Sequence, residues 1–177
     1  MKGIIFNVVE DVVAIEWGPS VWDKLLSQAG LDGAYTSLGS YPDEQFSRLI
    51  SAASELMGDS KARLLLRIGR LAIPKLYKRF PKFFDQAANL RSFVLSINTI
   101  IHPEVHKLYT GAGCPHFHFV ETENTVTLGY NSPRKLCYLA QGFILGLADY
   151  YDETISVRQP ICMHDDHPMC QIEIAWV

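Results

Sequence analysis

The stretch Asn98-Thr99-Ile100-Ile101-His102-Pro103-Glu104-Val105 places one histidine at the end of a long apolar helix. The spacing of apolar residues predicts that this helix starts near Gln86. A buried imidazole in such a helix needs a partner, because an unpaired polar group in an apolar setting costs free energy. Pro103 removes a backbone amide directly after the histidine and loosens the helix there. A histidine in this place is more often a capping or core residue than a metal ligand, so the stretch alone leaves both interpretations open.

The composition of the 177 residues is that of one compact domain with enough apolar side chains, 48%, to build a core. The 16 basic and 19 acidic residues give a formal charge of -3, which argues against a nucleic-acid partner, since phosphate binding needs a concentrated basic surface. No stretch reaches the roughly 18 apolar residues of a membrane span, and the first residues lack the apolar run of a secretion signal. We therefore expect a cytoplasmic protein without a membrane partner, whose cysteines are thiols or metal ligands rather than disulfides.

The order of predicted elements indicates an α+β fold. Helices are predicted over 4–17, over 20–29 with Ser20 and Asp23 as a capping box, over 42–57, and over 60–79 around Pro74. After residue 113 the apolar period falls to two, which predicts a hairpin over 117–130. Ser132 and Pro133 then predict the start of a helix that reaches about residue 150, and strands are predicted at 155–157 and 172–176. A helical lobe followed by a small antiparallel sheet with helices results.

Tyr130, Ser132 and Arg134 stand at alternate positions where the predicted strand meets the helix. All three side chains can donate hydrogen bonds, and the planar fork of Arg134 suits a carboxylate. If the chain stays extended through Arg134, the three side chains share one face that would bind a doubly acidic group. A helix cap with an exposed salt bridge explains the same residues, and the spacing alone favours that simpler interpretation.

Other constellations of chemically active residues are few. His102 and His106 lie one helical turn apart, but Pro103 occupies the place where a zinc protease of this pattern needs glutamate. A second metal candidate is the group Cys137, Cys162, His164, His167 and Cys170, whose thiolates and imidazoles suit Zn²⁺, with free thiols in a polar loop as the alternative. Because no phosphate loop, nucleophile turn or pair of apolar-set carboxylates is present, we expect no enzymatic activity.

The histidine stretch and the Tyr-x-Ser-x-Arg motif occur here together, and with them the chain resembles the haem-nitric oxide/oxygen binding (H-NOX) domain, which is related to the sensor domain of soluble guanylate cyclase. The resemblance covers the whole chain, 1–177, as a single domain. It includes the segments Met1–Asn7, Trp22-Asp23, Tyr35–Ser37, Ser40-Tyr41, Phe80-Pro81, Ile101–Val105, Lys107–Tyr109, Tyr130–Arg134 and the helix of Cys137. It implies a haem held between a helical lobe of about 1–60 and a lobe of about 61–177 that carries the ligating histidine and the sheet.

The resemblance assigns roles to residues of this sequence. His102 would be the proximal ligand of a b-type haem, and Tyr130, Ser132 and Arg134 would hold its propionates. Pro115 matches the proline that the family packs against the macrocycle, and Ile5, Val9 and Leu76 fall where the family lines the pocket. Oxygen-binding members carry a distal tyrosine where this chain has Leu139. Since leucine cannot donate a hydrogen bond to bound O₂, we expect a sensor that binds NO, binds CO weakly and excludes O₂.

The family also suggests how the signal leaves the protein. NO would weaken the bond between iron and His102, and the freed helix would shift one lobe against the other. Such domains usually act in trans on a histidine kinase or on a diguanylate cyclase/phosphodiesterase. Some bacterial members hold zinc with three cysteines and a histidine, but that histidine is Gln159 here, so His164 or His167 would have to replace it. The alternative function is a small zinc-stabilised enzyme or a haem-free binding module that uses the same cavity.

Overall fold

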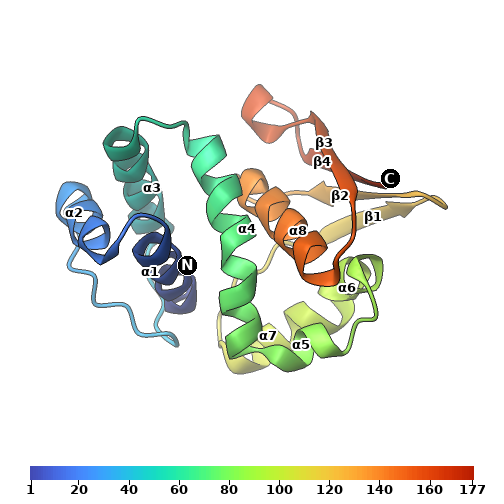
Figure 1. Ribbon diagram of the computed structural model, residues 1–177, viewed down its shortest axis with the longest axis horizontal. Coiled ribbons are helices and arrows are strands. Elements are labelled where there is room, and N and C mark those ends of the chain that lie inside the picture. The colour runs from blue at the N-terminus through green and yellow to red at the C-terminus, as the bar shows by residue number, and fades with distance from the viewer.

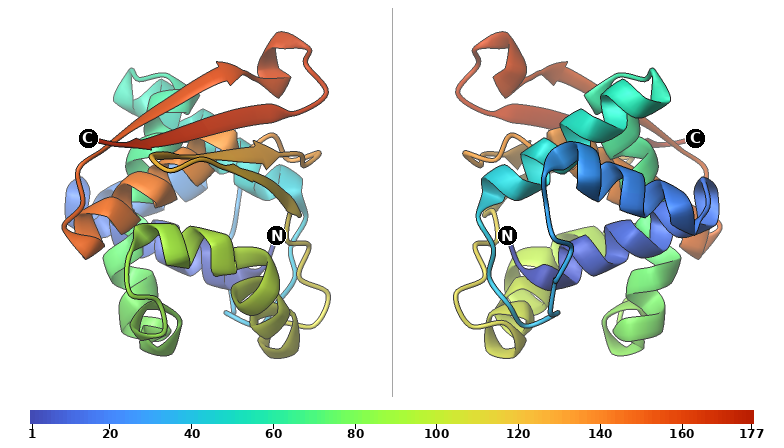
Figure 2. Two further views of the ribbon diagram at one scale, coloured as in Figure 1. Left: turned by 90° about the vertical axis from the view of Figure 1, so that its right-hand side faces the viewer. Right: turned by 90° about the vertical axis from the view of Figure 1, so that its left-hand side faces the viewer.

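The computed structural model describes residues 1–177 and contains two groups of elements on either side of one long helix, α4 (Lys61–Arg79) (Figure 1). Helices α1 (Gly3–Glu16), α2 (Pro19–Ala29) and α3 (Asp43–Met57) lie on one side of it. On the other side α8 (Cys137–Tyr151) packs along α4, and the sheet lies beyond. The two side views confirm that α1–α3 and the sheet occupy opposite sides of the molecule (Figure 2). The predicted α+β architecture is confirmed.

Four antiparallel strands form the sheet in the order β1-β2-β4-β3. Their bounds are Phe117–Glu121 for β1, Thr125–Tyr130 for β2, Ile155–Ile161 for β3 and Cys170–Trp176 for β4. In the register, Tyr130 lies opposite Phe117 on one side and opposite Cys170 on the other. A short 3-10 helix, η2 (Met163–Asp165), lies in the loop between β3 and β4. Side chains of β1, β2 and β4 therefore come together in one row across the sheet.

The segment between α4 and the sheet carries the histidine stretch. It contains α5 (Pro81–Asp85), α6 (Leu90–Ser96), a π-helical turn η1 (Ile97–Ile101) and α7 (His102–Leu108). The helix predicted from about residue 86 begins at Leu90, because the Asn89 side chain caps it by accepting a hydrogen bond from the Ser92 amide at 2.8 Å. None of the helices in the chain is sufficiently long and apolar to span a lipid bilayer.

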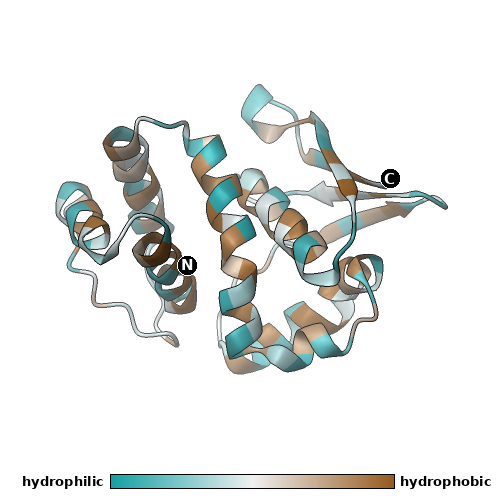
Figure 3. Cartoon of the chain, viewed as in Figure 1, coloured by the Kyte–Doolittle hydropathy of each residue, from teal (hydrophilic) through white to brown (hydrophobic).

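Two hydrophobic cores lie in the two halves of the molecule, and the halves built on them are called here the helical lobe (α1–α4) and the sheet lobe (α5–α8 and the four strands). The first lies among α1–α4 and is built on side chains that include Phe6, Phe46, Leu49 and Leu64. The second lies between α8 and the sheet and includes Leu90, Leu128, Ile172 and Ile174. Hydrophobic residues cover much of α1 in Figure 3, which agrees with its burial. Leu76, Tyr138 and Phe143 contact both cores and so join the lobes.

Glycines allow α4 and α8 to approach backbone to backbone. A Cβ atom added at Gly69 would lie 2.5 Å from the carbonyl oxygen of Leu139, and one added at Gly142 would lie 2.2 Å from that of Leu66. These distances are far below van der Waals contact between the atoms concerned. The crossing therefore depends on the missing side chains, and it sets the position of Leu139 on α8.

Two predicted helix starts are wrong. Helix α2 begins at Pro19 after Gly18, whose φ of 97° ends the preceding turn, so Ser20 does not cap it. Helix α8 begins at Cys137 rather than at Pro133, because Lys135 adopts a left-handed φ of 49° that interrupts the helical path. Strands β3 and β4 are also longer than predicted. The chain turns directly after Tyr130, and this turn decides how the next three residues point.

Candidate cofactor site

His102 stands at the junction of η1 and α7. Pro103 has no amide, and its ring would collide with the carbonyl group four residues earlier in a regular α-helix. The helix widens by one residue here, and the His102 amide donates to the carbonyl oxygen of Ile97, five residues back. Single π-turns of this kind are rare and occur frequently at functional sites. The sequence predicted a loosened helix, whereas the structure adds the form of the distortion.

The imidazole of His102 is half buried, and its ring centre lies 5.6 Å from that of Phe117. Burial, followed by the charges of His106 and His116, lowers the pKa of His102 to about 4. The ring is therefore neutral at pH 7 and has a nitrogen lone pair available for a metal. His106, the other member of the helical pair, is exposed to solvent.

Tyr130 and Ser132 are both buried, with 3% and 4% of their surface exposed. The Tyr130 hydroxyl accepts a hydrogen bond from the Leu136 amide at 2.9 Å, and burial raises the pKa of this phenol, which keeps its proton available for donation. The Ser132 hydroxyl accepts from the Arg134 amide at 3.3 Å. Ser132 thus caps a local turn rather than α8, and both hydroxyls remain close to the point where the chain leaves β2.

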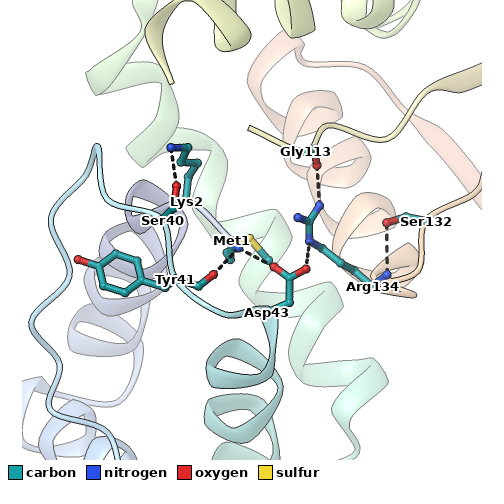
Figure 4. Close-up of polar contacts among 8 residues, drawn as sticks. All are labelled: Met1, Lys2, Ser40, Tyr41, Asp43, Gly113, Ser132 and Arg134. Carbon is teal, nitrogen blue, oxygen red and sulfur yellow. Dashed lines mark hydrogen bonds and ion pairs between the residues drawn. The ribbon is translucent and has the colours of Figure 1, made fainter. Parts of the chain in front are cut away.

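Arg134 joins the two lobes (Figure 4). Its Nε donates to Oδ2 of Asp43 at 2.8 Å, and its Nη1 donates to the carbonyl oxygen of Gly113 at 2.5 Å. The other carboxylate oxygen of Asp43 accepts from the Met1 amino group at 2.5 Å. Burial acts to raise the pKa of Asp43, but the hydrogen bonds from Met1 and Arg134 outweigh it and hold this pKa below its usual range. The sequence reasoning missed Asp43, whose only signal was an acid in the first turn of a helix.

The Nη2 atom of Arg134 makes no hydrogen bond, so part of its planar fork is free for another carboxylate. This guanidinium is largely shielded, with 23% of the side chain exposed. A cation and two buried hydroxyls around one turn suit an anionic group. Together with a neutral imidazole, they are the donor set that a planar metal cofactor with acidic side groups needs.

The residues predicted to line the pocket lie on both lobes. Val9 of α1 and Leu139 of α8 are buried in the first core. Ile5 and Leu76 are half buried against that same core, and Pro115 is half buried in the segment that leads into β1. These apolar side chains fit the macrocycle of such a cofactor. The neighbouring Tyr138 is directed elsewhere, because its ring stacks on that of His164 at 5.6 Å.

A second group is formed by three buried thiols. Cys137 opens α8, Cys162 follows β3 and Cys170 opens β4. All three sulfur atoms lie within 4.8 Å of one another, and the Cys162 sulfur is 3.8 Å from each of the other two, too far for a disulfide. Burial raises the pKa of Cys137 to about 12 and also raises that of Cys170.

The histidines of the same loop lie outside the thiol group. His164 and His167 are both exposed, and Nε2 of His164 is 2.9 Å from the carbonyl oxygen of Lys135. The side chain of Gln159 does contact a thiol, since its amide nitrogen donates to the Cys137 sulfur at 3.5 Å. The structure thus brings together the three predicted cysteines without a histidine.

Comparisons with known proteins agree with this geometry. The family model described as Haem-NO-binding matches residues 2–159. An H-NOX protein from S. oneidensis, solved in its Fe(II)NO state, is 32% identical over 100% of this chain and 99% of that chain, with a TM-score of 0.94. The H-NOX domain of Shewanella oneidensis in the Fe(II)CO state is 31% identical over 100% and 99%, with a TM-score of 0.90. An unliganded Fe(II) H-NOX protein from K. algicida is 26% identical over 100% and 97%, also with a TM-score of 0.90. No curated protein sequence matched the chain.

Proposed function

The chain belongs to the haem-NO-binding (H-NOX) family of gas sensors, and from that premise we propose that it is a haem-based sensor of NO that excludes O₂. The observation that carries the proposal is the pairing of a neutral, half-buried His102 with an inter-lobe Arg134 whose fork is only partly used. A ferrous haem, when bound, supplies the iron that takes the gas. All other steps fall to side chains of this protein.

His102 would hold the iron from one side, because its neutral ring is a ligand without first losing a proton. The test is the absorption spectrum of purified His102→Ala against that of His106→Ala. His106 is exposed and one turn further along the same helix, so its loss should leave the spectrum unchanged. We expect His102→Ala to lose the absorption features of a histidine-ligated haem. In a His102→Gly variant, added imidazole should restore these features. Wild-type protein without a Soret band, after expression with ample haem, would favour the haem-free binding module instead.

Arg134, Tyr130 and Ser132 would hold the propionates. The free Nη2 of Arg134 offers two N–H donors, and the two buried hydroxyls belong to the last residue of β2, Tyr130, and to Ser132 of the following turn. Arg134→Lys keeps the charge but loses the planar fork, so we expect weaker haem retention in it. Arg158→Lys is a matched control, since Arg158 sits on β3 with 78% of its side chain exposed.

Selectivity for NO over O₂ would follow from Leu139. Bound O₂ carries partial negative charge and is stabilised by a nearby donor, whereas NO binds ferrous haem tightly without one. Leu139 has no donor, and the adjacent Tyr138 stacks on His164 instead. We expect no stable oxygen complex in air, and a gain of O₂ affinity in Leu139→Tyr but not in Leu139→Phe, which matches the size without the hydroxyl. A wild-type protein that forms a lasting oxygen complex would refute this assignment.

The three thiols Cys137, Cys162 and Cys170 fit the sulfur part of a zinc site, because a tetrahedral Zn²⁺ accepts three thiolates within such a group. Amides of Met163 and His164 donate to the sulfurs of Cys170 and Cys162, which stabilises thiolates. The fourth ligand would be Gln159, water, or a His164 ring turned away from Lys135. Metal analysis of protein purified without a polyhistidine tag should give about one zinc per chain in wild type and in Cys114→Ser. Little or none is expected in Cys170→Ser.

The output would be a movement of the helical segment that follows His102. Release of the imidazole would free that segment and so would change how the lobes sit relative to each other. Family membership supports signalling in trans, in the cytoplasm, to a histidine kinase or to a diguanylate cyclase/phosphodiesterase. The test is the activity of a purified enzyme of either class from the same organism, measured with the gas-free and with the NO-bound protein. An identical enzyme rate with both forms would argue against the proposed output.

A further inference from the structure

One polar side chain of the π-turn contacts the sheet at two points. The Nδ2 atom of Asn98 donates to the carbonyl oxygen of Phe117 at 2.6 Å, and the Phe117 amide donates to Oδ1 of Asn98 at 3.1 Å. A single side-chain amide therefore satisfies both backbone groups of one residue. Asn98 is half buried, so these bonds are partly protected from competition by water.

Phe117 is the first residue of β1, which is an edge strand. Its backbone groups are directed away from β2 and have no strand to pair with, and Phe117 itself is only 8% exposed. Unpaired backbone groups at a buried edge cost free energy, and the primary amide of asparagine carries the same donor and acceptor as a peptide unit. Asn98 thus acts as a one-residue substitute for a neighbouring strand.

This contact lies next to the ligating histidine. Asn98 is inside the turn whose first carbonyl, that of Ile97, accepts the His102 amide. The Phe117 ring lies 5.6 Å from the His102 ring. The backbone leading to His102 and an aromatic face beside its imidazole are consequently both attached to one asparagine.

The other anchors of this segment are far from the histidine. At its start, Glu153 accepts from the Leu90 amide at 2.7 Å, and Arg91 donates to the hairpin carbonyls of Thr122 and Glu123 at 2.9 and 2.8 Å. Closer to the histidine, the hydroxyls of Ser96 and Thr99 bond only to carbonyl groups of the same helix. Asn98 is therefore the last polar side chain before His102 that ties the helix to another element.

We propose that Asn98 is a positioning residue for His102: by bonding both backbone groups of Phe117, it fixes the π-turn against β1 and sets the direction of the imidazole toward the iron. The inference rests on the proposed role of His102 as the iron ligand. Because Phe117 begins β1, a displacement of that helix would reach the edge of the sheet first, through the same two hydrogen bonds.

The test compares three variants in ferrous, gas-free, haem-loaded protein by the frequency and width of the iron–histidine stretching band in resonance Raman spectra. Asn98→Leu keeps the size of the side chain and removes both bonds, whereas Asn98→Asp keeps only the acceptor for the Phe117 amide. Thr99→Val is the matched control, since Thr99 is exposed, adjacent and bonded only within its helix, at 3.5 Å. We expect a shifted and broader band in the leucine variant, a smaller shift in the aspartate variant and the wild-type band in the control.

A second measurement is the rate at which the His102–iron bond breaks after NO is added. Loss of the two bonds to Phe117 should raise this rate about tenfold in Asn98→Leu, the combined effect of two hydrogen bonds that each contribute about threefold. Amide exchange at Phe117 should accelerate by a similar factor, about tenfold, in the same variant. If the leucine variant does not fold, the aspartate variant gives the rate of bond breaking with a single bond removed, and its Phe117 amide, which keeps its acceptor, should exchange as in the wild type.

The outcomes separate this inference from the proposed function. A haem-loaded wild-type protein without an iron–histidine band would overturn both, because His102 would not be the ligand. A band that is present and unmoved in the Asn98 variants, with only a lower melting temperature, would overturn the inference alone. In that case Asn98 would stabilise the edge of β1 without directing the histidine.

Discussion

Replacing Gly142 with alanine should test whether the backbone contact between α4 and α8 holds the lobes in place. The added Cβ atom would lie 2.2 Å from the Leu66 carbonyl oxygen, 2.8 Å from the Gly69 Cα and 2.9 Å from the Arg70 amide nitrogen. Since carbon atoms normally approach to about 3.5–4.0 Å, the helices must part by about 1 Å. All three neighbours are backbone atoms, so no side chain can rotate away.

Two effects of opposite sign decide the result. Alanine favours a helix over glycine by about 1 kcal/mol, which alone would stabilise the variant. Overpacking of a close-packed core costs about 1–3 kcal/mol, and the contact with rigid backbone places Gly142→Ala at or above the upper end. The net loss is about 2 kcal/mol, which for a protein of this size corresponds to a melting temperature lower by about 4–8 °C.

Thermal melting followed by circular dichroism measures the difference. The matched control is Ser47→Ala, an exposed position on α3 whose side chain makes no hydrogen bond, where only the propensity gain of about 0.5 kcal/mol applies. Gly69→Ala should behave like Gly142→Ala, because its Cβ would meet the Leu139 carbonyl at 2.5 Å. If Gly142→Ala melts at or above the wild-type temperature, the helices yield easily and the reasoning from these distances is wrong.

Three further outcomes follow from the charges of the site. Asp43→Asn should lower the unfolding free energy by only about 1 kcal/mol or less, since the Asp43 side chain is 46% exposed, and it should slow haem transfer to a haem-free acceptor protein, because a propionate then has no charged competitor for Arg134. Haem-free protein should lose stability as the pH falls from 6.5 toward 4. The unfolded chain binds a proton at His102 in this window and the folded chain, with a pKa of about 4, does not. The difference of about 2.5 between the pKa of His102 in the unfolded and folded chain limits the loss of unfolding free energy to about 3.4 kcal/mol, and the partial exposure of the ring reduces it to about 1–2 kcal/mol. His102→Gln should remove this pH dependence, which urea denaturation at each pH measures. Zinc binding should release protons, because burial raises the pKa of the Cys137 and Cys170 thiols, and calorimetry in two buffers of different ionisation enthalpy measures their number.

The elements of this fold could largely be predicted because their apolar periods are strong. The change of period after residue 113 predicts the hairpin that the structure forms as β1 and β2. Helix boundaries were less predictable where one residue serves two local structures. Ser132 has the residue type of a helix cap, but its hydroxyl bonds two residues on, and Lys135 then adopts a left-handed conformation. The same side-chain signal therefore marked a turn rather than a helix.

The sequence predicts which residue types form the candidate site, but it does not predict which residues those side chains contact. The sequence identifies Arg134 as a carboxylate binder, but its actual partner Asp43 is 91 residues away and lies in the other lobe. Likewise, Pro103 predicts a distortion near His102, whereas the hydrogen bonds that join the π-turn to the sheet go to the distant backbone of Phe117. In the cysteine loop the residue types suggested a histidine ligand, and only the geometry gives the direction of the His164 ring toward Lys135.

Two kinds of contact join the lobes, and they differ in what can change them. The crossing of α4 and α8 consists of backbone atoms and apolar side chains, so it responds to volume and hardly to charge. The pair of Arg134 and Asp43 is partly exposed, is worth about 1 kcal/mol or less, and uses the same guanidinium that would bind a propionate. A carboxylate of the cofactor can therefore compete with Asp43 at a small cost, whereas nothing comparable competes at the helix crossing. A change in the haem should therefore alter the contact between the lobes at Arg134 first, while the crossing of α4 and α8 keeps its geometry.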